Sequence, residues 1–256
     1  MAHLPVFVAI SSKFSEKDVI SSYEGFLKIV SEKYEVLPER VIYFKNEDLS
    51  ENWEDELEKV TDFLNEQISK GGILHLSLMV PATFALALGM NLSRSQIPPM
   101  VVYHYQAGRY FPVVDLIDNP RKVKDISKSM ENILLDFENE ATSKECAILI
   151  QFASHSMKSS VAEFLKKNNT SCSMLEITDK SVGNLEIGDW SKEVSEVYKA
   201  IQDIRRENYI ERFHFFMSAP ISFAFVLGLS LGRYVPATIY QFIPSSQEIY
   251  KDVIKI

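Results

Sequence analysis

The sequence lacks the features that mark secreted and membrane-spanning proteins. It contains only two cysteines, Cys146 and Cys172, which fit neither a CxxC metal pair nor a disulfide framework. No apolar run reaches the roughly 18 residues that a membrane helix requires, because Pro81 and Gly89 interrupt the most apolar stretch, 73–90. The N-terminus has no basic region ahead of a long apolar one, so it is not typical of a signal peptide. We therefore expect a cytoplasmic protein that makes no membrane contact.

Several enzyme and metal motifs are missing as well. The absence of GxGxxG, a Walker loop and GxSxG counts against a dinucleotide dehydrogenase, a P-loop NTPase and an α/β-hydrolase. His75 and His214 lie within apolar runs, and no acidic residue completes a metal motif with them, so we interpret both as core histidines and predict neither a metal nor a cofactor. A net charge of -8 disfavours long duplex DNA as a partner. A small anionic ligand stays compatible with that charge, because helix N-termini and one or two cations can hold it.

Short apolar runs alternate with amphipathic segments along the chain. This order predicts strands at 6–10, 40–44, 73–79, 100–105, 110–116, 147–152, 173–177, 213–217 and 237–242. It predicts helices at 16–34, 49–70, 82–92, 159–167, 190–207 and 221–231. Such alternation indicates mainly parallel sheets with helices on both faces. We expect two halves, 1–120 and 145–256, joined by a connecting segment at 121–144 in which 126–137 forms a helix.

An internal repeat is the strongest pattern. The segment HLSLMVPATFALALGMNLSRSQIPPMVVYHY begins at His75, and HFFMSAPISFAFVLGLSLGRYVPATIYQF begins at His214. With one two-residue gap, the segments share two prolines, a glycine, an arginine and a tyrosine, which indicates duplication of a β-α-β unit. We therefore predict an α/β protein of two Rossmann-like halves related by a pseudo-twofold axis. The helix in each copy is apolar almost all round and must be buried, and we place both helices at the seam between the halves.

Candidate ligand-binding residues follow from this plan. Each repeated helix begins after a proline, with its unpaired N–H groups at the carboxyl edge of the sheet, where open α/β folds bind ligands. Polar loops follow the first strand of each half, and an aromatic residue beside His104 or Gln241 is suited to stack on an adenine. The candidates are Ser11, Ser12, Lys13, Ser77, Pro81, Ala82, Thr83, His104, Tyr105, Ser154, His155, Ser156, Lys158, Ser218, Ala219, Pro220, Gln241 and Phe242. The alternatives are ordinary helix capping for the serine loops and surface packing for the strand ends.

The second copy resembles a known family. The string SAPxSFAFVLGxxLGRxxPxxxYQ is similar to the C-terminal signature of SAVED domains, with matches at Ser218, Ala219, Pro220, Ala224, Gly228, Gly232, Arg233, Tyr240 and Gln241. SAVED domains are paired CARF-like Rossmann folds of bacterial antiphage signalling, found in CBASS and type III CRISPR systems. The resemblance implies a sensor of cyclic tri- or tetra-adenylate, with a pocket that spans both halves. Family members are usually fused to an effector, whereas the two halves here use all 256 residues. We therefore expect either a separate effector chain or that this chain is one fragment of such a system.

Two other functions stay open beside the sensor hypothesis. A ring nuclease would cleave the bound messenger, with His155, Lys158 and Lys13 as candidate acid–base groups. An assembly subunit would have lost the ligand site altogether. For a sensor, we expect that the ligand drives self-association or the docking of an effector, which would present a basic face to this acidic chain.

Overall fold

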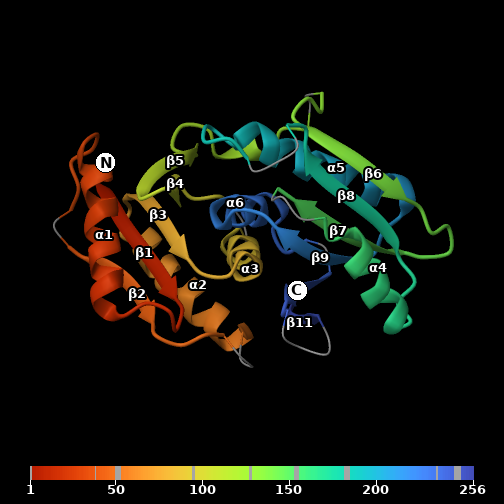
Figure 1. Cartoon of the computed structure of the whole chain (residues 1–256). Helices are drawn as coiled ribbons and strands as arrows, with labels where there is room; N and C mark the ends of the chain where they lie inside the picture. Colours follow the sequence, from red (N-terminus) through yellow and green to blue (C-terminus); the bar gives the residue numbers. More distant parts are fainter. Residues whose placement is uncertain are drawn as a thin grey trace.

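A computed structural model gives the fold and describes residues 2–37, 39–49, 53–93, 96–126, 129–152, 156–181, 185–234, 236–244 and 249–256. The chain forms two sheets, with strand orders β2-β1-β3-β4-β5 and β11-β10-β9-β7-β8-β6. Figure 1 shows the two sheets facing each other across a central pair of helices. The prediction of an α/β protein with two mainly parallel sheets is therefore confirmed.

The first sheet is built from the N-terminal half of the chain. Its strands are β1 (His3–Ile10), β2 (Val41–Lys45), β3 (Ile73–Met79), β4 (Met100–Gln106) and β5 (Arg109–Asp115). Its helices are α1 (Glu16–Ser31), α2 (Trp53–Ser69) and α3 (Ala82–Leu92). The first four strands run parallel, and β5 returns antiparallel to β4.

The second sheet repeats this order. Its strands are β6 (Ile133–Glu138), β7 (Glu145–Gln151), β8 (Ser173–Asp179), β9 (Arg212–Ser218), β10 (Ala237–Phe242) and β11 (Tyr250–Lys255). Its helices are α4 (Lys158–Lys167), α5 (Ser191–Asn208) and α6 (Ile221–Leu231), and a short 3-10 helix (Pro120–Lys124) lies between the halves. β11 runs antiparallel to β10, as β5 does to β4, so the duplication extends through this hairpin.

The layers follow from which residues are buried together. α1 packs on the outer face of the first sheet through Val19, Tyr23 and Phe26, and α4 packs on the outer face of the second through Val161 and Leu165. Helices α2, α3, α5 and α6 share one central core with the inner faces of both sheets. The two halves therefore have a common hydrophobic interior.

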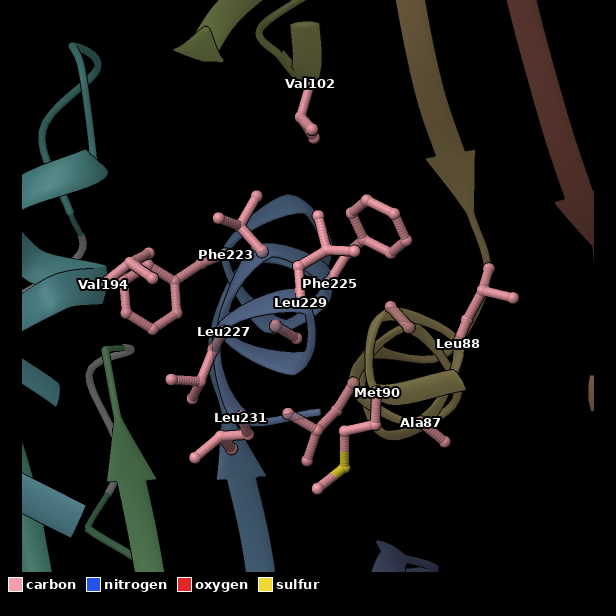
Figure 2. Close-up of a cluster of buried hydrophobic side chains, with 14 of the residues drawn as sticks. Ala87, Leu88, Met90, Val102, Val194, Phe223, Phe225, Leu227, Leu229 and Leu231 are labelled. Atoms are coloured by element: carbon pink, nitrogen blue, oxygen red, sulfur yellow. The ribbon is translucent and has the colours of Figure 1, made fainter. Parts of the chain in front are cut away.

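The seam between the halves consists of α3 packed against α6 (Figure 2). Every residue from Thr83 to Leu92 and from Ser222 to Leu231 is buried, as the apolar character of both helices predicted. The helices touch through their glycines: a Cβ added at Gly89 would lie 2.1 Å from the carbonyl oxygen of Phe225, and one added at Gly228 would lie 2.1 Å from that of Leu86. The two contacts are equivalent under the repeat, because Leu86 and Phe225 occupy matching positions in the two copies.

Two predictions at the ends of the second half were wrong. The helix predicted over 126–137 is not formed, because 129–132 are not helical and β6 begins at Ile133. The segment is a strand because it pairs antiparallel with β8, from Ile133 opposite Asp179 to Glu138 opposite Met174. The chain also does not end its sheet at Phe242, since β11 adds a further strand. The β4–β5 hairpin of the first half was the pattern that could have predicted it.

Candidate functional site

A cleft of about 580 Å³ opens at the carboxyl edge of the first sheet. β1, β3 and β4 run parallel and end at this edge, and α3 begins beside them. The lining residues are Phe7, Ile10, Ser11, Lys13, Phe14, Ser22, Asp48, Ser77, Leu78, Met79, Val80, Pro81, His104, Tyr105, Tyr110 and Ile221. Its size falls within the roughly 300–1,000 Å³ of typical small-molecule sites.

Six of the predicted ligand-binding residues lie in this cleft, namely Ser11, Lys13, Ser77, Pro81, His104 and Tyr105. The structure therefore brings together the polar loop after β1, the end of β3 and the end of β4, as expected of parallel strands. Sequence reasoning missed Phe14 and Asp48. Asp48 follows β2, and the rule that ligand sites collect at carboxyl strand ends would have found it.

Two aromatic groups form one wall of the cleft. Tyr105 is 54% exposed, and its ring centre lies 4.8 Å from that of Tyr110. The ring of His104 lies 5.0 Å from that of Trp190, at the start of α5 in the second half. Burial lowers the pKa of His104 and raises the pKa of Tyr110 to about 12, so both side chains are uncharged at neutral pH. This wall therefore offers ring faces and neutral hydrogen-bonding groups.

The charged groups of the cleft come from the segments that follow β1 and β2. Asp48 accepts hydrogen bonds from the backbone N–H of Ser12 at 2.9 Å and from its hydroxyl at 2.6 Å. These bonds lower the pKa of Asp48, and Ser12 is not among the residues that line the cleft. Lys13 is exposed and forms no ion pair with any residue that the structure describes. Its ammonium is the positive charge available to a phosphate in this cleft.

The corresponding edge of the second sheet is occupied by ion pairs. Lys158 Nζ lies 2.6 Å from Asp136 Oδ2 and 2.6 Å from Glu138 Oε1, and these carboxylates raise the pKa of the lysine. The buried Gln151 side chain bonds to Glu176 and to the backbone N–H of Met157. Ser154 and His155 lie outside the described residues, and Ser156 is exposed.

Ser218, Ala219 and Pro220 are half-buried where β9 leads into α6. None of the three lines the cleft, although Ile221, the next residue, does. The Ser218 carbonyl accepts a hydrogen bond from the Phe152 N–H at 2.8 Å. Among the described residues of the second half, the cleft thus includes Ile221 alone, and a pocket spanning both halves stays a prediction.

Two reciprocal hydrogen bonds cross the seam near the cleft. The hydroxyl of Thr83, in α3, donates to Gln241 Oε1 at 2.5 Å, at the end of β10. The hydroxyl of Ser222, in α6, donates to the Tyr103 carbonyl at 2.8 Å, in β4. Thr83 and Ser222 match in the repeat, so each half ties its helix start to the other half's strand. Ala82 packs against the central core, and Phe242 is 47% exposed beside Tyr250.

The repeated histidines are core residues, as their position in the sequence predicted. His75 is fully buried and bonds to the Tyr103 hydroxyl at 3.0 Å and to His3 at 2.8 Å. His214 bonds to the Tyr240 hydroxyl at 3.0 Å and to Glu145 at 2.8 Å. Burial lowers the pKa of His75 to about 4. The repeat therefore includes a buried histidine–tyrosine pair.

The three candidate acid–base groups do not meet at one place. Lys13 is in the cleft, Lys158 is enclosed by carboxylates at the other sheet, and His155 lies outside the described residues. A raised pKa makes Lys158 unsuited to accept a proton at neutral pH. Across the described ranges, no three histidine, cysteine or acidic side chains are placed to hold a metal ion. No helix in the described part of the chain is long and apolar enough to span a membrane.

The fold and the cleft define an α/β ligand-binding protein made of two duplicated Rossmann-like halves. The model of the SAVED family, described as "SMODS-associated and fused to various effectors sensor domain", matches residues 2–116 and 118–256. The chain belongs to this family of sensor domains, and the resemblance found in its sequence is thereby confirmed. A search of curated proteins gave no match.

Solved structures agree on the fold. The Acinetobacter baumannii Cap4 SAVED/CARF-domain containing receptor with the cyclic trinucleotide 2'3'3'-cAAA has a TM-score of 0.63 and 17% identity over 98% of this chain and 51% of that one. The same receptor with 3'3'3'-cAAA has a TM-score of 0.61, with the same identity and coverage. The Moraxella osloensis receptor has a TM-score of 0.51 and 14% identity over 98% and 49%. The chain thus spans about half the length of these receptors.

Proposed function

We propose that this chain is a sensor in antiviral defence that binds a cyclic oligoadenylate, a cyclic tri- or tetra-adenylate, at the cleft of the first sheet. The observation that carries the proposal is the combination of an ion-pair-free ammonium, serine hydroxyls and exposed aromatic rings around one cleft. Phosphates need the first two and bases the third. Family membership and the cyclic trinucleotides in the Cap4 structures support the same ligand class.

Each wall takes a distinct part of the ligand in this proposal. Tyr105 and Phe14, which are 54% and 36% exposed, provide faces on which an adenine stacks. Lys13 and the hydroxyl of Ser11 bind a phosphate. The ionised carboxylate of Asp48 accepts hydrogen bonds from an adenine amino group or a ribose hydroxyl.

Calorimetry tests the ligand. Titration of the chain with cyclic tri-adenylates of both linkages and with cyclic tetra-adenylate should give saturable binding to at least one. Lys13→Gln should weaken that binding about tenfold, which corresponds to about 1.4 kcal/mol. Lys17→Gln is the matched control, because Lys17 is exposed four residues away and does not line the cleft. Absence of binding at tens of micromolar, or equal effects of both substitutions, contradicts the proposal.

In this proposal, the nucleotide-bound sensor transmits its signal through contacts with other protein chains. Ligand binding favours self-association or the docking of an effector chain, and the acidic charge favours a partner with a basic face. Light scattering with and without the nucleotide measures the first route, and co-purification with the effector measures the second. A constant mass together with no effector binding contradicts this part.

A further inference from the structure

β6 is an unpaired edge of the second sheet. It pairs with β8 on one side, and no strand of the described chain pairs with its other side (Figure 1). The Lys180 N–H donates to the Asn132 carbonyl, which fixes the alternation of the antiparallel ladder. The backbone N–H and C=O groups of Ile133, Leu135 and Phe137 therefore point outward, away from β8.

The other sheet edges are poor templates for pairing. β5 contains Pro112, which lacks a backbone donor, and β11 carries Lys251, Asp252 and Lys255. β2 has five residues and ends at the ion-paired Lys45. Natural edge strands are usually blunted by short length, prolines or charges of this kind.

β6 instead exposes two leucines, one on each face. Leu134 is 46% exposed and Leu135 is 41% exposed. Its two charges, Asp136 and Glu138, are both engaged by the ammonium of Lys158 at 2.6 Å. The edge thus combines outward-pointing backbone groups and apolar side chains with carboxylates whose negative charge Lys158 partly offsets.

The sequence of β6 is complementary to itself in one antiparallel register. If the strand pairs with a second copy about a twofold axis at Leu135, the outward-pointing residues of both strands form the hydrogen-bonded pairs. On one face, Leu135 meets the partner subunit's Leu135, and Ile133 meets the partner subunit's Phe137. On the other face, Leu134 meets the partner subunit's Asp136, and Glu138 meets the partner subunit's Asn132. No carboxylate opposes another.

We propose that two copies of this chain pair their β6 strands antiparallel about Leu135 and form a dimer without any nucleotide. The two six-stranded sheets become one continuous sheet across the interface. The contact is isologous and therefore closes at two subunits. It is separate from the nucleotide cleft, which lies on the first sheet, and it does not rest on the proposed sensor function.

Light scattering without nucleotide is the first test. The wild-type chain at micromolar concentration should have twice the 29.3 kDa mass of one chain. Leu135→Lys places two ammonium groups opposite each other at the axis and should give the monomer mass. Leu134→Lys is the matched control, because the new charge faces the partner subunit's Asp136 and the dimer should persist. A monomeric wild type, or equal loss of the dimer in both variants, overturns the proposal.

Cross-linking is the second test and does not depend on weakening the fold. Residues in a hydrogen-bonded antiparallel pair have Cα atoms about 5.5 Å apart, which is compatible with a disulfide. Mild oxidation of Leu135→Cys should yield a covalent dimer, whereas Leu134→Cys should not. Absence of the covalent dimer in the first variant contradicts the register. Nucleotide binding by both lysine variants, measured separately, shows whether the sensor function fails or holds independently.

Discussion

At the first sheet's carboxyl edge, Lys13 forms no ion pair with described residues beside an open cleft, whereas at the corresponding edge of the second sheet Lys158 lies 2.6 Å from two carboxylates. The two halves nevertheless share the glycine contact and the crossed hydroxyl bonds at their seam. The two copies have therefore stayed similar where they are buried against each other and differ at the surface. We therefore expect ligand binding to depend on the surface residues that differ between the halves, such as Lys13.

The buried histidines of the two halves also differ, because each has a different hydrogen-bond partner. Under the repeat, His3 and Glu145 occupy matching strand positions, because β1 and β7 pair in the same register with the histidine strands β3 and β9. His75 therefore has a second imidazole as its partner, whereas His214 has a carboxylate. One half holds its histidine neutral, and the other offers it a negative charge.

The largest expected effect concerns the glycine contact, where the halves are most alike. Gly89→Ala and Gly228→Ala should each destabilise the fold by about 3 kcal/mol or more, because the new Cβ would lie 2.1 Å from a backbone oxygen. Gly188→Ala is the control, since nothing lies within 4 Å of its added Cβ. Urea denaturation measures all three variants. If Gly89→Ala and Gly228→Ala lose unequal amounts of stability, the two contacts are not equivalent.

Acidification should destabilise the fold through His75. His75 has a folded-state pKa of about 4, below its value near 6.5 in the unfolded chain, so the unfolded state takes up the proton first. Its contribution to stability is complete above pH 6.5 and is lost as the pH falls toward 4, by up to about 3 kcal/mol. Between pH 7.5 and pH 4.5, the free energy of unfolding of His75→Asn should fall less than that of the wild type, as measured by chemical denaturation. His214→Asn retains His75 and should therefore keep the decrease in the free energy of unfolding that His75 causes. If both variants reduce this decrease equally, the comparison is wrong.

The two lysines should differ in ligand binding. Lys13→Gln weakens nucleotide binding about tenfold in the proposed site, whereas Lys158→Gln should leave the affinity within about twofold, because its ammonium already binds two carboxylates. Calorimetry with the same cyclic oligoadenylate measures both. A comparable loss of nucleotide affinity in Lys158→Gln would instead support a ligand pocket that spans both halves.

The smallest effect should come from the crossed hydroxyl bonds. Ser222→Ala removes the donor to the Tyr103 carbonyl, and Thr83→Val removes the donor to Gln241. Each should cost about 1 kcal/mol of stability, and the double variant should show the sum, because the bonds share no partner. Chemical denaturation of the three variants checks this. A strong coupling between the substitutions would show that the two bonds act as one unit.

Most of the fold could be predicted from the sequence because it rests on local patterns. The paired prolines and glycines identify the repeat, and the all-apolar helices place the seam. β6 was missed because its apolar residues also suit a helical period, and only its pairing with β8 decides between the two. The cleft was half predicted: Lys13 and His104 lie at strand ends, which the sequence marks. The closure of the second edge by Lys158 depends on contacts between distant segments, which no local pattern encodes.

The glycine contact between α3 and α6 also bears on how the two halves depend on each other. Each glycine meets the backbone of the equivalent helix at the equivalent residue, which is the geometry of two identical subunits at a twofold axis. A single copy of the unit would leave an entirely apolar helix without a cover. Each copy of the duplicated unit therefore depends on the other to cover its apolar helix. The pseudo-twofold axis thus relates the two halves as a dimer axis relates two subunits, with the linking chain replacing the concentration dependence of a dimer.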